Sequence, residues 1–85
     1  MSTLTITVTS SIDFCWKWEV EERNPHWHTS QAVGFGVARS PAIALRRAQD
    51  AIAVFMTDYP GAYAVAPVTV DGRVVVLAEP LRGVP

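Results

Sequence analysis

The chain has 85 residues, of which 49% are hydrophobic and 18% are charged. This composition is typical of a folded chain and excludes a disordered one, and a chain of this length can close only one hydrophobic core, so we expect a single domain over residues 1–85. Seven basic and eight acidic side chains give a net charge of −1. The basic excess that is typical of nucleic-acid-binding proteins is therefore missing.

The sequence predicts a cytoplasmic protein with no membrane association. The first residues, MSTLTITVTSS, have neither the basic segment nor the unbroken apolar run of a signal peptide. No apolar run approaches the ~18–20 residues that a membrane span needs. Cys15 is the single cysteine, so no internal disulfide can form, which favours a reducing compartment.

Residues 4–20, LTITVTSSIDFCWKWEV, alternate between apolar and polar side chains. Every even position except Ser10 is apolar, which is the pattern of strands with one buried and one solvated face. A single strand of this length would reach ~56 Å at ~3.3 Å per residue, well beyond the ~25–30 Å width of such a domain. We therefore predict two strands, 3–9 and 13–22, with a bend at 10–13. Three large side chains of the second strand are expected in the core: Phe14, Trp16 and Trp18.

A loop and a third strand are predicted to follow. Asn24-Pro25 indicates a turn, so residues 23–30 are expected to form a loop. The third strand is predicted over 31–38 and is expected to pair with 13–22 as a hairpin. Its alternation is expected to divide five residues between two sides: Val33, Phe35 and Val37 on one, Gly34 and Gly36 on the other.

A helix is predicted from Ser40 to about Asp58. Serine is a good N-cap and Pro41 fits the first turn, while Tyr59-Pro60-Gly61 ends the pattern. At 100° per residue the apolar side chains form one stripe that is expected to face the sheet. Its members are Ala44, Leu45, Ala48, Ala51, Ile52, Phe55 and Met56.

The C-terminal part predicts a second hairpin. Asp71-Gly72 separates two β-branched runs and is typical of a two-residue turn, so strands are expected over 66–70 and 73–78. The predicted fold class is therefore α+β: an antiparallel sheet with one helix packed on one face, in the order β-β-β-α-β-β.

Two surfaces are candidates for partner binding. The first is the loop 23–30, with Arg23, His26, Trp27 and His28, where the tryptophan could anchor a partner or cap the open edge of the core. The second is a helix face with Ile43, Arg47, Asp50 and Val54, spaced 4, 3 and 4 residues apart. Exposed aliphatic residues beside charges suit a protein contact, although isolated ones are also ordinary.

The arginines near the helix start support an alternative function. Lys17, Arg39, Arg46 and Arg47, with Arg23, could form a local basic patch for nucleic acid. The competing interpretation is a solvated cluster in which Arg46 pairs with Asp50 one turn later.

No enzymatic activity, cofactor or metal is expected. His26 and His28 could face the same way in an extended segment, but zinc needs three or four ligands, and the other candidate ligands stand at no recognised spacing. Those candidates are Asp13, Cys15, Glu19, Glu21 and Glu22. The sequence contains no nucleophile elbow and no phosphate-binding glycine loop.

Three resemblances accompany these predictions. The run GFGVARSPAIALRRAQDAI is similar to part of a double-stranded-RNA-binding domain, although the basic pair that follows the serine there is Pro41-Ala42 here, which removes the phosphate contacts. The strand-strand-helix-strand order resembles HicB-type antitoxins, without their Gly-Asp-Thr start of the helix. The Trp-x-Trp-x-Val strand followed by an Ala/Arg helix is similar to small proteins of actinobacteria and their phages.

The sequence thus predicts a small, non-enzymatic interaction or regulatory protein. The expected partner is another protein, and the third resemblance implies a phage-encoded chain that acts on a host factor. We also expect that the chain can self-associate, since a small sheet with open edges can pair with a second copy. A nucleic-acid-binding regulator is the alternative.

Overall fold

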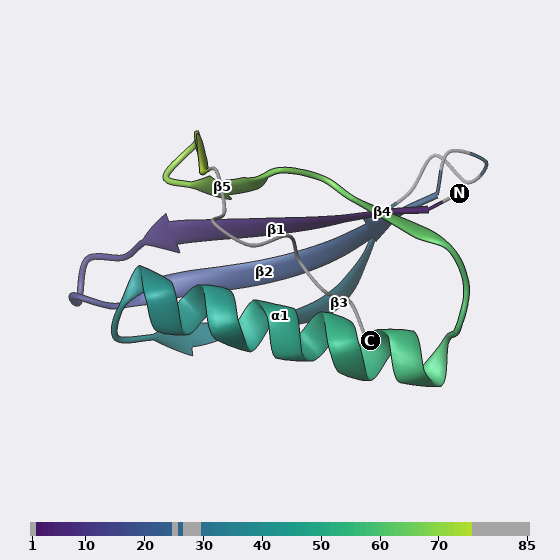
Figure 1. Cartoon of the computed structure of the whole chain (residues 1–85). Helices are drawn as coiled ribbons and strands as arrows, with labels where there is room; N and C mark the ends of the chain where they lie inside the picture. Colours follow the sequence, from purple (N-terminus) through teal and green to yellow (C-terminus); the bar gives the residue numbers. More distant parts are fainter. Residues whose placement is uncertain (1, 25, 27–29, 76–85) are drawn as a thin grey trace.

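A computed structural model of the protein describes residues 2–24, 26 and 30–75 (Figure 1). In chain order the elements are β1 (Ser2–Ser10), β2 (Trp16–Arg23), β3 (Ser30–Ala38), α1 (Pro41–Asp58), β4 (Tyr63–Val65), β5 (Val68–Val70) and β6 (Arg73–Val75). The α+β class, with one helix on one face of a sheet, is confirmed. The predicted order β-β-β-α-β-β is also confirmed, with the short strand β4 added between α1 and β5.

The strands lie side by side in the order β3-β2-β1-β5-β6, and β4 also pairs with β1. The two predicted hairpins, β2–β3 and β5–β6, are antiparallel, as is β1–β2. Both β4 and β5 run parallel to β1, so the sheet as a whole is mixed and the prediction of an antiparallel sheet is wrong for these two pairings. The helix causes this, because it carries the chain back along the sheet and lets the next strands start at the same end as β1.

The core lies between α1 and one face of the sheet. Its members are fully buried or nearly so: Leu4, Ile6, Val8, Val20, Ala38, Ala44, Ala48, Ile52 and Val68. The even positions of β1 supply three of its largest side chains, as the alternation predicts. The helix contributes the predicted stripe, in which small alanines allow close approach. Trp16 and Trp18 pack against this cluster and are partly buried.

The prediction for Phe14 is wrong. Its side chain is 94% exposed, because β1 ends at Ser10 and residues 11–15 form a turn in which the Ser11 N–H donates to the Cys15 carbonyl oxygen over 2.8 Å. Alternate residues share a face only while the backbone stays extended. The turn therefore takes Phe14 out of the alternating pattern, which begins again at Trp16 and Trp18 in β2.

The predicted grouping of Val33 with Phe35 and Val37 is also wrong. Val33 packs against the core, whereas Phe35 and Val37 lie on the outer face and are 78% and 50% exposed. The register of β2 with β3 shifts between Val20 and Glu21, which leaves one extra residue on β3. Such a bulge breaks the two-residue alternation of side chains.

The Asp71-Gly72 turn and the helix start are confirmed. Asp71 and Gly72 have φ angles of 49° and 79°, as a type I′ turn requires. Strand β6 is described as far as Val75, so the rest of the predicted strand 73–78 lies outside the described residues. Among those described, no helix is long and apolar enough to span a bilayer.

Replacing Ser40 by alanine is expected to lower the free energy of unfolding by about 1 kcal/mol. The Ser40 hydroxyl accepts a hydrogen bond from the Ile43 N–H over 3.2 Å, and alanine leaves that donor without its partner. Thermal denaturation followed by circular dichroism measures the loss, which corresponds to about 4–8 °C for a domain of this size. Ser40→Asp keeps an acceptor and should melt close to the wild type; equal losses in both variants would contradict the capping role.

Candidate functional site

The described residues include several exposed large apolar side chains. Within residues 2–24, 26 and 30–75, no group of three or more His, Cys, Asp or Glu side chains could hold a metal ion. Two hollows of about 390 and 360 Å³ are wide open to solvent and lie on either side of β3. The exposed apolar side chains are therefore the candidate features for a contact.

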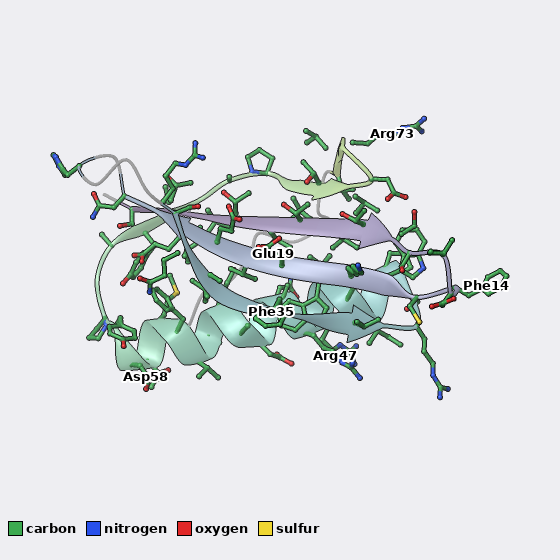
Figure 2. The ribbon with its side chains drawn as sticks, turned by 180° about the vertical axis from the view of Figure 1, so that it is seen from behind. Phe14, Glu19, Phe35, Arg47, Asp58 and Arg73 are labelled. Carbon is green, nitrogen blue, oxygen red and sulfur yellow. The ribbon has the colours of Figure 1, made fainter. Side chains whose placement is uncertain are left out.

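Among the described residues, the most exposed large apolar side chains lie at one end of the sheet. Residues 11–15, which we call the loop tip, connect β1 to β2, and within it Ile12 is 96% exposed and Phe14 is 94% exposed. Figure 2 shows Phe14 projecting from this end, away from the helix and the sheet. A protein that exposes two neighbouring side chains of this size loses the ~1.5–3 kcal/mol that burying each would provide. Such exposure favours a contact surface.

The backbone of the loop tip is held in an uncommon conformation at Phe14. Its φ angle is 57°, in the left-handed region, which costs ~1–2 kcal/mol for a residue with a Cβ atom. The Ser11–Cys15 hydrogen bond closes the loop, and the Cys15 thiol donates to the Asp13 carbonyl oxygen over 3.4 Å. Strained residues of this kind cluster at functional sites, which makes the loop tip a candidate contact surface.

A second apolar surface follows the helix, and we call it the helix ridge: Ile43, Arg47, Asp50 and Val54. Ile43 is 40% exposed and Val54 is 64% exposed, in accord with the helical spacing. The ridge runs beside the open edge of the sheet, because Arg47 donates from Nη1 to the Val37 carbonyl oxygen of β3 over 2.9 Å. The side chains of Arg47 and Val54 thus border the edge strand.

The predicted loop surface is described only in part. Arg23 is the last residue of β2 and is exposed, and the exposed His26 donates its backbone N–H to Asn24 Oδ1 over 2.9 Å. Trp27 and His28 lie outside the described residues. The anchoring role of Trp27 therefore stays a prediction.

The basic residues of the nucleic-acid alternative come from different faces. Lys17 pairs with Val37 in the register of β2 and β3 and lies on the outer face, beside Phe35. Arg46 and Arg47 are exposed on α1, which covers the opposite face, and Arg39 precedes the helix. The sheet thus separates Lys17 from the helix arginines.

An aromatic cluster closes the end of the core that is remote from the loop tip. The Phe55 ring lies 5.2 Å from the Tyr59 ring and 5.4 Å from the Tyr63 ring, centroid to centroid. Tyr63 donates its hydroxyl to the Tyr59 carbonyl oxygen over 2.7 Å. Burial, and then the Glu22 carboxylate, raise the pKa of Tyr63, so this phenol stays protonated and keeps its role as a donor.

Sequence reasoning found the exposed aliphatic residues of the helix ridge but missed the loop tip. The signal was present in Ser10-Ser11 and Asp13, turn-forming residues that interrupt the alternating stretch, yet the apolar parity of Phe14 outweighed them. The candidate site is thus the loop tip, with the helix ridge as a second surface. Comparison of the chain with family models, with curated proteins and with solved structures finds no match.

Proposed function

We propose that the protein is a small, non-enzymatic interaction protein that binds a partner protein through its loop tip. The observation that supports this most is the near-complete exposure of Ile12 and Phe14, with Phe14 held at a φ angle of 57°. The partner would offer an apolar pocket that accepts a phenyl ring and a neighbouring aliphatic side chain. Aromatic side chains that enter such pockets commonly dominate the affinity of protein complexes.

A regulatory role for this contact belongs to the same proposal. A phage-encoded chain that acts on a host factor is what the resemblance to small actinobacterial and phage proteins implies.

The nucleic-acid-binding alternative has its own test, which is a fluorescence titration with duplex DNA and duplex RNA at two salt concentrations. Binding that weakens steeply with salt would support it, since contacts with phosphate release counterions.

The loop-tip proposal predicts that Phe14→Gly loses binding without losing stability. Glycine adopts the left-handed region freely, so its free energy of unfolding should equal that of the wild type or exceed it by up to about 1 kcal/mol. Removing the phenyl ring, which the partner would bury, should weaken the affinity for the partner at least tenfold, because ~1.5–3 kcal/mol from apolar burial is lost. Chemical denaturation measures the first quantity, and a binding titration with the purified partner measures the second.

The partner is first identified by capture from a lysate of the source cells on immobilised protein, followed by quantitative mass spectrometry. Ile12→Ser should abolish the enrichment of at least one captured protein. The matched control is Val74→Ser on β6, which removes another exposed aliphatic side chain, 64% exposed, from a strand that β5 separates from β1. Identical captured proteins from the wild type and from both variants would refute a role for the loop tip.

A further inference from the structure

In the part of the chain that the structure describes, strand β3 forms an edge of the sheet, and its sequence lacks the usual protection against pairing. It is nine residues long, Ser30–Ala38, and its sequence SQAVGFGVA contains no charge and no proline. Edge strands of monomeric proteins commonly carry charged residues or proline, because an open row of backbone N–H and C=O groups is a template for another strand. We propose that β3 pairs antiparallel with β3 of a second copy of this chain, which makes a two-fold symmetric dimer with one continuous sheet.

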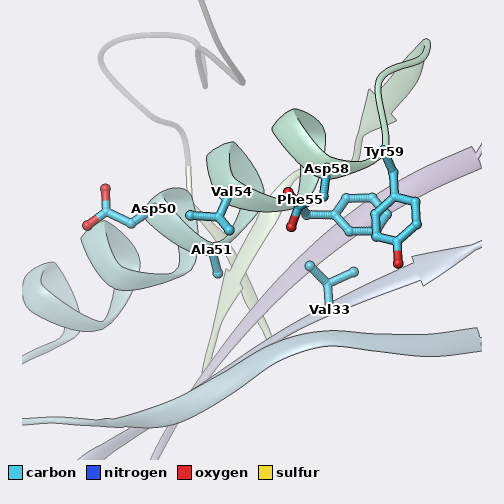
Figure 3. A pocket seen from close by; sticks show the side chains of 7 residues that line it. All are labelled: Val33, Asp50, Ala51, Val54, Phe55, Asp58 and Tyr59. Carbon is cyan, nitrogen blue, oxygen red and sulfur yellow. The ribbon is translucent and has the colours of Figure 1, made fainter.

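Apolar side chains border this edge on both faces of the sheet. On the outer face, Phe35 and Val37 are exposed, and Figure 2 shows Phe35 on the side that the helix leaves open. On the helix side, a groove of about 390 Å³ lies between Val33 and the helix. Figure 3 shows Phe55 on the helix above Val33, with Val54 and Ala51 beside it on the side of Asp50. A strand that is added here would therefore bury apolar surface on both sides as well as satisfy backbone groups.

The geometry of β3 points to one register. The bulge at Val33 ends the regular part of the edge on one side, and Ala38 ends it on the other, so Phe35 lies near the centre. Arg47 reaches the Val37 carbonyl oxygen from outside the sheet, and alternate residues of a strand direct their backbone groups to the same edge. Phe35 would therefore face Phe35 of the second copy, and Val37 would face Val33 of the second copy. The Val37 oxygen can keep Arg47 and accept a second donor, since a carbonyl has two lone pairs.

The charges of the helix fit this register. Arg47 lies at Val37, whereas the groove beside Val33 is lined by Asp50 and Asp58. A two-fold axis near Phe35 brings Val37 of one copy to Val33 of the other, so the Arg47 guanidinium of each copy would meet the acidic groove of its partner. The contact would thus be self-complementary in charge as well as in backbone hydrogen bonds.

Sedimentation equilibrium of the full chain over a range of concentrations tests the proposal. The chain has a mass of 9.3 kDa, and the wild type is expected to approach twice that value. Phe35→Lys would place two like charges together at the axis and should return the mass to that of one chain. Val74→Lys introduces the same charge at an exposed position of β6, 64% exposed against 78% for Phe35, at the other end of the strand order, and should stay a dimer.

A second pair of variants tests the charge argument. Arg47→Glu should weaken the dimer at least tenfold in dissociation constant, whereas Arg46→Glu, the same change one residue away, should leave it within about twofold. Circular dichroism melts show that each variant folds, and amide hydrogen exchange shows whether the Phe35 N–H is protected in the wild type and released in Phe35→Lys. A wild type that stays at 9.3 kDa throughout, or a dimer that Phe35→Lys leaves intact, would overturn the proposal. The loop-tip variants should still dimerise, so this test is separate from that of partner binding.

Discussion

Ile6→Ala is expected to lower the free energy of unfolding by about 2–5 kcal/mol, whereas Ile12→Ala should change it by less than about 0.5 kcal/mol. Both isoleucines occupy even positions of the same alternating stretch. Ile6 is fully buried between the sheet and α1, so its truncation leaves a cavity, while Ile12 is 96% exposed in the loop tip and its truncation leaves none. The two variants therefore distinguish the residues of the alternating stretch that pack in the core from those that the turn places outside it.

Urea denaturation, monitored by the fluorescence of the tryptophans, measures both changes. For a domain of this size each kcal/mol corresponds to about 4–8 °C in melting temperature, so Ile6→Ala should melt at least about 8 °C below the wild type. A loss of similar size in Ile12→Ala would show that the loop tip packs into the core, and it would remove the basis of the proposed contact.

Gly36→Ala is expected to destabilise the protein by about 1–3 kcal/mol, although alanine normally stabilises a chain by restricting its unfolded state. A Cβ atom at Gly36 would lie 2.8 Å from Trp18 Nε1 and 3.0 Å from two further atoms of the indole ring. Trp18 is paired directly with Gly36 across the strands and also contacts the position of Gly34, so its ring has little room to move. Thermal and chemical denaturation measure the loss.

Two comparisons make this prediction specific. Gly61→Ala is the control, since its Cβ atom would lie 3.7 Å from the nearest atom of Tyr63, an ordinary contact, and it should be neutral or slightly stabilising. Trp18→Phe removes the atoms that the new methyl group would meet, so Gly36→Ala should cost less in that background. Additive losses in the double variant would contradict the proposed clash.

The buried Trp18 Nε1 finds no hydrogen-bond acceptor in the described part of the chain.

The sequence predicts those parts of the fold in which one local rule decides the outcome. The apolar alternation of β1, the Ser40 cap with the apolar helix stripe, and the positive φ angles at Asp71-Gly72 each follow from backbone geometry over a few residues. The exposed aliphatic residues of the helix ridge could be predicted for the same reason, because 100° per residue places Ile43 and Val54 away from the core stripe.

The features that could not be predicted depend on distant parts of the chain. The bulge at Val33 arises from the pairing of β3 with β2, and no local pattern marks the extra residue. The short strand β4 and the parallel direction of β5 depend on where α1 returns the chain. The prediction for the loop tip was wrong for a different reason. Turn-forming residues and the apolar alternation gave conflicting expectations at Phe14, and the structure follows the turn.

The central position of β1 has a consequence for how the protein folds during synthesis. One side of β1 pairs with β2 within the first 23 residues, but its other side pairs with β5, where Thr7 and Val8 meet Thr69 and Val70. The Ser10 N–H and hydroxyl both donate to Asp71 Oδ1, over 2.8 and 3.0 Å, across a separation of 61 residues. In a nascent chain this side of β1 therefore stays unpaired until β5 has left the ribosome. Contacts of such long range are formed late and slowly, so completion of the sheet should limit the rate of folding.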